Sequence, residues 1–272
     1  MNPTLAQITK QLLASYGRFP RKRLGQHFLI DPKVVGRIIK AAELKPDDLV
    51  IEIGSGLGVV TAELAKHAYQ VIAIEIDKEL VKISQDVLEP FQNIRFVARD
   101  FLKLELSALA LGRKYKIIGN LPYYITAPII EKILEAKDKA EVAVLMVQKE
   151  VAERMTADPG TKKYGSFSVF VQYHADTELD SFVSKSSFHP WPEVGSAIVA
   201  LRPYPTPKYR VKNEKHFFDV VHAAFQQRRK KLKNSLAKYR LEASNIDLNR
   251  RPETLSIAEF VEIANYCYNL SS

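Results

Sequence analysis

The stretch Leu49-Val-Ile-Glu-Ile-Gly-Ser-Gly-Leu-Gly58 decides the fold that the sequence predicts. Its first five residues form a short apolar run rich in β-branched side chains, which indicates a buried strand. Glycines then occupy every second position, and a helical pattern follows over 59–67. A strand, a glycine-rich turn and a helix N-terminus form a nucleotide-type pocket, because glycines let the backbone approach a ligand.

The spacing of the glycines favours one cofactor over another. A dinucleotide fingerprint needs its last glycine at position 59, where this chain has Val59. The Gly-x-Gly-x-Gly spacing after Glu52 favours S-adenosylmethionine over NAD. Gly54 is expected to line the pocket, and Glu75 ends the next strand, 70–77, 21 residues later. An acid at that place can accept hydrogen bonds from both ribose hydroxyls.

Three further strands are predicted, and two of them end at a candidate ligand. The strand 94–100 ends at Asp100, whose carboxylate could accept from an adenine amino group, although strand ends often carry Asp. The strand 115–119 leads to Asn120, and 141–147 is the fifth. The pattern predicts an α/β fold with a doubly wound parallel sheet, whose ligands lie outside the carboxyl ends of the strands. Strands at Ser166–Tyr173 and Ser196–Arg202 are predicted to form an antiparallel edge hairpin.

The tetrapeptide Asn120-Leu-Pro-Tyr123 is the candidate substrate site. The amide of Asn120 has both a donor and an acceptor, and the following proline makes the turn stiff. With an aromatic ring beside it, this arrangement suits a planar, hydrogen-bonding substrate such as a nucleobase. The alternative is a strand-to-helix turn with two packing aromatic rings. Phe188 is expected to face the same pocket, with burial as a loop anchor as the alternative. For Trp191 burial as a loop anchor is the favoured interpretation.

Basic residues cluster in two segments. From Arg202 to Arg240 twelve Lys and Arg face two acids, a local net charge of +10 in a chain of +9. An excess of this kind predicts a polyanionic partner, with solubility as the alternative. The basic run Ala224–Leu236, with helices predicted over 216–225 and 226–236, is predicted to contact RNA or DNA phosphates. The N-terminal arm is the second basic segment, and the alternative for it is a solvated segment without a partner. The candidate phosphate contacts in the two segments are Arg21, Lys22, Arg23, Arg228, Arg229, Lys230, Lys231 and Lys233.

The 272 residues are enough for one large core and a small second domain. A linker with three prolines, 203–207, separates a predicted catalytic domain, 1–203, from a helical basic domain, 208–272. The single cysteine, Cys267, excludes an intrachain disulfide, and no clustered Cys and His predict a metal. No signal-peptide pattern or membrane-length apolar run is present. A cytoplasmic monomer without a membrane partner is therefore expected.

Four motifs together resemble the bacterial small-subunit ribosomal RNA adenine dimethyltransferases (the KsgA family) nearly from end to end. The motifs are Glu52-Ile-Gly-Ser-Gly-Leu-Gly58, Asn120-Leu-Pro-Tyr123, Phe188-His-Pro-Trp-Pro192 and the basic signature from Ala224. The match begins at Lys22-Arg-Leu-Gly-Gln-His-Phe-Leu29. The resemblance implies a Rossmann-like class I methyltransferase sheet plus a small helical domain. Glu193 departs from the family, which often has Lys at that place.

The resemblance also implies the activity and the residues that carry it. The family transfers methyl groups from S-adenosylmethionine to N6 of two adjacent adenosines in the 3′-terminal hairpin of 16S rRNA, with a role in ribosome biogenesis. His27, Leu29, Gly54, Glu75, Asp100 and Asn120 would bind the cofactor. Asn120 and the Leu121 carbonyl would accept from the amine, and Tyr123 and Phe188 would stack on the base.

Two other functions remain open from the sequence. The first alternative is a macrolide-resistance type of enzyme, which methylates 23S rRNA. It shares the half of the chain that binds the cofactor and has a similar Asn-x-Pro-Tyr site. The arm Gly25–Leu29 and the basic run 224–236 favour the small-subunit enzyme. The second alternative is a non-catalytic ribosome-assembly factor, and the intact glycine loop with Glu75, Asp100 and Asn120 disfavours it.

Overall fold

The computed structural model describes residues 3–136, 139–227, 230–239, 241 and 246–271. Its contacts divide the chain into two compact units, one of residues 1–152 and 177–203 and one of 153–176 and 204–272. The sequence places a boundary at 203–208, where the chain also passes between the units. Residues 153–176, however, group with the C-terminal helices, because Tyr164, Val169 and Tyr173 are buried among apolar residues of that unit.

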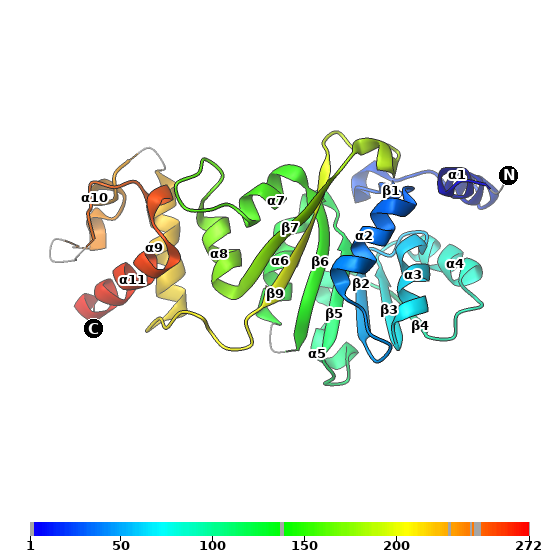
Figure 1. The fold of residues 1–272 in the computed structure, drawn as a ribbon, viewed down its shortest axis with the longest axis horizontal. Helices are drawn as coiled ribbons and strands as arrows, with labels where there is room; N and C mark the ends of the chain where they lie inside the picture. Colours follow the sequence, from blue (N-terminus) through cyan, green and yellow to red (C-terminus); the bar gives the residue numbers. More distant parts are fainter. Residues whose placement is uncertain (1–2, 137–138, 228–229, 240, 242–245, 272) are drawn as a thin grey trace. The chain divides into compact units, whose positions relative to one another are not determined.

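A seven-stranded sheet is the framework of the first unit (Figure 1). The strand order is β4-β3-β2-β5-β6-β9-β7. The first five are parallel to their neighbours, and β9 runs antiparallel to β6. The strands are β2 (Leu49–Ile53), β3 (Gln70–Glu75), β4 (Ile94–Ala98), β5 (Tyr115–Asn120), β6 (Ala140–Gln148), β7 (Ala175–Val183) and β9 (Ser196–Pro203).

Strand β2 lies inside this framework, between β3 and β5, and all five of its side chains are buried. Burial on both faces explains why its sequence is almost continuously apolar rather than alternating. The strand order reverses between β2 and β5, whose register pairs Ile53 with Gly119. Such a switch point opens a crevice at the carboxyl ends of the strands, where ligands of this architecture bind.

Helices cover the sheet, and some of them begin at side-chain caps. Asp31 caps α2 and Pro32 is its first residue, while Asp77 caps α4. One face of α2 is buried against strands β5, β6 and β9, as Figure 1 shows. The helices are α1 (Leu5–Ser15), α2 (Pro32–Ala42), α3 (Val59–His67), α4 (Lys78–Val87), α5 (Leu106–Leu109), α6 (Thr126–Glu135) and α7 (Lys149–Met155), with 3₁₀ turns at Lys22–Leu24, Phe101–Lys103, Tyr123–Ile125 and Lys185–Ser187.

The predicted strand Ser166–Tyr173 is wrong, because these residues form helix α8 (Ser166–His174). Their β-branched and aromatic side chains suggested a strand. The buried pair Val169 and Tyr173 has helical spacing instead, and the Gly165 amide donates to Ser168 Oγ at 3.1 Å to begin the helix. The edge position beside β9 is taken by β7, whose burial alternates along its length.

The second unit is built from helices around aromatic rings. Tyr173 stacks on Phe217 with ring centroids 4.8 Å apart, and Phe225 lies 5.7 Å from Phe260. The helices are α8, α9 (Glu214–Gln226), α10 (Leu232–Ser235) and α11 (Ile257–Ser271), with 3₁₀ turns at Ala237–Tyr239 and Pro252–Thr254. Cys267 is buried in this core, as predicted.

The continuous basic helix predicted over 226–236 is also wrong, since α9 ends at Gln226 and α10 begins only at Leu232. Leu232 is fully buried, and its amide donates to the Arg250 carbonyl at 2.9 Å. This contact with a distant segment redirects the chain, and local helix propensity does not override it.

Candidate active site

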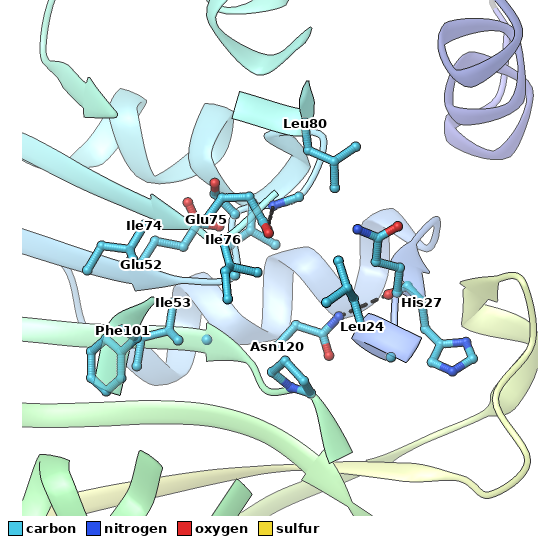
Figure 2. Close-up of a pocket in the computed structure, with 18 of the residues that line it drawn as sticks. Leu24, His27, Glu52, Ile53, Ile74, Glu75, Ile76, Leu80, Phe101 and Asn120 are labelled. Carbon is cyan, nitrogen blue, oxygen red and sulfur yellow. Dashed lines mark hydrogen bonds between the residues drawn. The ribbon is translucent and has the colours of Figure 1, made fainter. Parts of the chain in front are cut away.

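A cavity lies at the carboxyl ends of the strands, next to the switch point (Figure 2). Its wall comes from the glycine loop, from the residues that end β3 and β5 or follow β4, and from the N-terminal arm, defined as residues 18–29. All six residues that the sequence predicts to bind the cofactor line it, namely His27, Leu29, Gly54, Glu75, Asp100 and Asn120. The topology therefore brings together residues that are spread over 94 positions of the chain.

The glycine loop leaves room that side chains would fill. Gly54, Gly56 and Gly58 have φ angles of 73°, 55° and 80°, which L-residues rarely adopt. A Cβ at Gly54 would lie 3.5 Å from the Asn120 carbonyl oxygen, and one at Gly56 would lie 3.5 Å from the Phe28 ring. Ser55 Oγ is buried here without a hydrogen-bond partner among the described residues. An open backbone with an unsatisfied hydroxyl fits a polar ligand such as S-adenosylmethionine.

The substitution Gly58→Ala is expected to destabilise the protein by about 1–2 kcal/mol, the cost of a left-handed conformation for an L-residue. The added methyl would also meet Leu88 Cδ1 at 2.7 Å, so that side chain must move. Gly36→Ala is the control, because this exposed helical position has nothing within 4 Å and alanine is the better helix former. Urea unfolding should show opposite signs for the two variants, and equal effects would contradict the strain at Gly58.

Glu75 and Asp100 offer carboxylate oxygens to the cavity. The two oxygens of Glu75 accept from the Gly56 amide at 3.0 Å and the Asp77 amide at 2.9 Å. Burial raises the pKa of the Glu75 carboxyl, and these backbone donors oppose that rise. Asp100 Oδ1 accepts from the Leu102 amide at 3.0 Å. Because each carboxylate oxygen can accept more than one hydrogen bond, both groups retain capacity for ligand hydroxyl or amino groups.

The side-chain amide of Asn120 has a defined orientation. Its Nδ2 donates to the His27 carbonyl at 3.1 Å, so its Oδ1 is the free acceptor on the cavity side, with no hydrogen bond from the described residues (Figure 2). His27 is held in turn, because its Nδ1 lies 2.8 Å from the Pro190 carbonyl and donates to it. The short sheet of β1 (Phe28–Leu29) and β8 (Phe188–His189) joins the same two segments.

Ion pairs fasten the arm to the N-terminus of α4. Arg21 pairs with Asp77 at 3.2 Å and Arg18 with Glu79 at 2.7 Å, and Gln26 Nε2 donates to Asp77 at 3.1 Å. Arg21, a predicted phosphate contact, therefore already has an acidic partner. Arg23 is exposed.

Three predicted substrate residues do not line the cavity. Leu121 is buried and its amide donates to the Met146 carbonyl at 3.0 Å. Tyr123 stacks on His27 with ring centroids 5.9 Å apart, and its hydroxyl lies 2.8 Å from Ser196 Oγ. Phe188 is 1% exposed and packs in the core, because β8 pairs it with Leu29. In this conformation Phe188 has no free face for a base.

The interpretation of Trp191 as a buried loop anchor is wrong, since its side chain is 70% exposed. The Tyr124 ring was not assigned a role from the sequence, yet it lines the cavity and is 57% exposed. The sequence signal was present in the double tyrosine, but which ring faces the cavity depends on the 3₁₀ turn Tyr123–Ile125.

Glu52 also lines the cavity, and no role for its side chain is predicted from the sequence. Thr61 Oγ1 donates to its carboxylate at 2.5 Å. Burial raises the pKa of Glu52 to about 7, opposed by the Thr61 hydroxyl and reinforced by the charge of Glu75. A buried carboxyl in a cavity, with its pKa moved into the working range, is typical of functional sites.

The basic residues of the second unit are described in part. Lys230, Lys231 and Lys233 are exposed, whereas Arg228, Arg229 and the side chain of Lys22 lie outside the described residues. Among the residues that the structure describes, no cluster of His, Cys, Asp and Glu has the composition of a metal site. The described helices include none that is both long enough and apolar enough to cross a bilayer.

The model of the family described as "Ribosomal RNA adenine dimethylase" matches residues 18–269 of this chain. The chain belongs to this family. Its members are S-adenosylmethionine-dependent methyltransferases, so the chain is an enzyme of that class, and the resemblance inferred from the sequence is confirmed. The glycine loop, the acid at the end of β3 and the Asn120 amide all line one cavity.

Relatives of the family resemble the chain over most of its length. "Ribosomal RNA small subunit methyltransferase A" of Alkaliphilus metalliredigens (strain QYMF) is 42% identical over 94% of both chains. The protein of the same name from Ligilactobacillus salivarius (strain UCC118) is 41% identical over 97% of this chain and 94% of its own.

Two solved structures of related enzymes share the fold. A dimethyladenosine transferase from Plasmodium falciparum has a TM-score of 0.75 at 26% identity, over 87% of this chain and 96% of that one. The 23S rRNA methyltransferase ErmE has a TM-score of 0.73 at 29% identity, over 89% and 99%. These likenesses confirm the predicted class I methyltransferase fold.

Proposed function

We propose that this enzyme transfers methyl groups from S-adenosylmethionine to N6 of two adjacent adenosines in the 3′-terminal hairpin of 16S rRNA, as a step of ribosome biogenesis. The single observation that carries the proposal is the Asn120 amide at the cavity wall, fixed by the His27 carbonyl with Oδ1 left to accept. The small-subunit assignment is supported by the names of relatives that match nearly the whole chain.

The cofactor has a place for each of its parts in this proposal. The open backbone at Gly54 would take the methionine part, with His27 and Leu29 of the arm beside it. Glu75 would accept from the ribose hydroxyls, and Asp100 from the adenine amino group. When bound, the cofactor supplies a methyl group that is already activated on a sulfonium. The arm would cover the cofactor while the ion pairs of Arg18 and Arg21 hold it closed.

The protein's own contribution is to aim the nucleophile. The lone pair of adenine N6 is delocalised into the ring, which makes this nitrogen a poor nucleophile. Asn120 Oδ1 would accept one of its two hydrogens and the Leu121 carbonyl the other, which would bias the nitrogen towards tetrahedral geometry. Because Leu121 does not line the cavity in the present conformation, its part requires the turn after β5 to move. Catalysis of this kind is mainly alignment, and no general base is required because the methylated amine can lose its proton to water.

The base must leave its stack to reach the cavity, at a cost of a few kcal/mol that stacking inside the site offsets. Tyr123 is proposed to supply one face. Phe188 can supply the other only if the β1–β8 segment moves, because its ring is buried in the present conformation. The exposed Lys230, Lys231 and Lys233 and the arm residue Arg23 are proposed to contact phosphates, which makes RNA binding weaken as salt rises.

The specific rival is methylation of 23S rRNA, favoured by the likeness to ErmE. Transfer of radiolabelled methyl from S-adenosylmethionine to unmethylated small and large ribosomal subunits separates the two. We expect N6,N6-dimethyladenosine in the small-subunit 3′ hairpin. Label only in large-subunit rRNA would establish the rival. Cofactor binding without label in either subunit would favour a non-catalytic assembly factor.

A further inference from the structure

The loop that follows β8 holds an exposed tryptophan on a rigid support. Trp191 is 70% exposed, although tryptophan is usually well covered. Its two neighbours are prolines, whose fixed φ angles stiffen the chain. Pro192 is buried, and the Pro190 carbonyl accepts from His27 Nδ1 at 2.8 Å. The indole therefore projects from a segment that is anchored on both sides.

This support contacts the wall of the cavity through His27. His27, which binds Pro190, also accepts from Asn120 Nδ2 through its carbonyl and lines the cavity itself. At the end of the same loop, Ser196 Oγ lies 2.8 Å from the Tyr123 hydroxyl. Trp191 therefore follows Pro190, whose carbonyl is bonded to His27. His27 in turn orients Asn120, the side chain that would face the reacting amine.

We propose that Trp191 is a substrate-positioning residue that stacks on the nucleotide next to the adenosine in the cavity. The inference rests on the proposed function, in which the two target adenosines are adjacent. When one of them enters the cavity, its neighbour loses a stacking partner, and the exposed indole on the loop that contacts His27 would replace it. Every base offers a flat face, so this contact holds the second base without reading its identity.

The charges around Trp191 favour contact with a base over contact with a phosphate. Glu193 is exposed two residues further along, where a negative charge repels the RNA backbone. Lys185 Nζ donates to the Glu193 carbonyl at the same loop. A flat ring bordered by an acid therefore suits stacking and does not suit an ion pair with phosphate.

Trp191 is the only tryptophan of the chain, so its fluorescence reports this contact directly. The probe is the unmethylated 3′ hairpin of small-subunit rRNA, compared with the same hairpin carrying an abasic site in place of one of the two adenosines. Titration into the enzyme with bound cofactor should quench the fluorescence with the intact hairpin and much less with the abasic one. Quenching that is equal for both hairpins, or absent at saturation, would overturn the proposal.

Steady-state methylation of small subunits gives the second readout. Trp191→Ala is expected to lower kcat/KM for the RNA by about 5- to 100-fold, and Trp191→Phe to keep most of it, since either ring can stack. Cofactor binding should not change in either variant. Tyr69→Ala is the matched control. This ring is 58% exposed and lies just before the amino end of β3, whereas the cavity lies at the carboxyl ends of the strands.

The outcomes separate this inference from the proposed function. Wild-type enzyme that labels no small-subunit rRNA would refute the function. Wild-type enzyme that labels it, together with an equally active Trp191→Ala variant, would refute only the role of Trp191. If Trp191→Phe loses as much activity as Trp191→Ala, the side chain at this position acts through something other than stacking. That result would also overturn the inference.

Discussion

Replacing Asn120 with alanine is expected to lower kcat for methyl transfer by about 10²- to 10³-fold, the usual effect of removing one preorganised polar group from a transition state. The variant loses Oδ1, the acceptor that would aim the amine lone pair. Cofactor affinity should change by less than about tenfold, because the bond lost to the His27 carbonyl is one net hydrogen bond. Single-turnover methylation and cofactor titration measure the two quantities.

Asn93→Ala is the control for that experiment. Asn93 also anchors backbone through its amide, with Nδ2 donating to the carbonyls of Ala65 at 2.8 Å and Ala68 at 3.0 Å. It does not line the cavity, so its loss should reduce stability and leave kcat unchanged. An Asn120→Ala enzyme that binds cofactor and methylates at the wild-type rate would remove Asn120 from the mechanism.

Replacing Glu52 with glutamine is expected to stabilise the ligand-free protein above pH 7. The pKa of Glu52 is about 7 in the folded protein against an ordinary 4.5, chiefly because of burial. Between these values the folded protein holds a proton that the unfolded chain releases. The stability of the wild type therefore falls as the pH rises through this window, by about 1.4 kcal/mol per unit and roughly 3 kcal/mol in all.

The variant cannot ionise, and its amide oxygen can still accept from Thr61. Urea unfolding should therefore show little difference between variant and wild type at pH 4.5 and a gain of about 3 kcal/mol at pH 8. Glu63→Gln is the control, since this exposed acid pairs with Lys66 on the surface of α3 and should matter by less than about 1 kcal/mol. A gain that does not depend on pH would contradict the buried ionisation.

A buried carboxyl that costs stability when charged indicates a requirement of the site. Glu52 begins the glycine-loop motif and lines the cavity, where burial penalises its ionised form. Proteins keep such groups at functional positions, where the strain is offset elsewhere in the structure. The Glu52→Gln variant should therefore also be tested for cofactor binding, because Glu52 affects the stability of the fold and also lines the cavity.

The predictions that the structure corrects share one cause. In each case the local sequence favours one structure, and contacts with residues far away in the chain stabilise another. Ser166–His174 has strand-like side chains, yet Val169 and Tyr173 find their burial among the helices of the second unit. The basic run after Gln226 has strong helix formers, yet Leu232 is drawn into that core and its amide bonds Arg250. Trp191 is predicted to be buried as a loop anchor, and yet its side chain is 70% exposed between two prolines.

The sequence by itself determined the parallel sheet, the glycine loop and the set of residues at its carboxyl edge. This was possible because Gly54, Glu75, Asp100 and Asn120 each follow or end a strand, and parallel strands end at one edge. Only the tertiary structure decided how the site is arranged. The Asn120 amide is oriented by a carbonyl 93 residues away, and the pairing of β1 with β8 buries Phe188. Such contacts join segments that no local pattern relates, so their geometry exists only once the chain has folded.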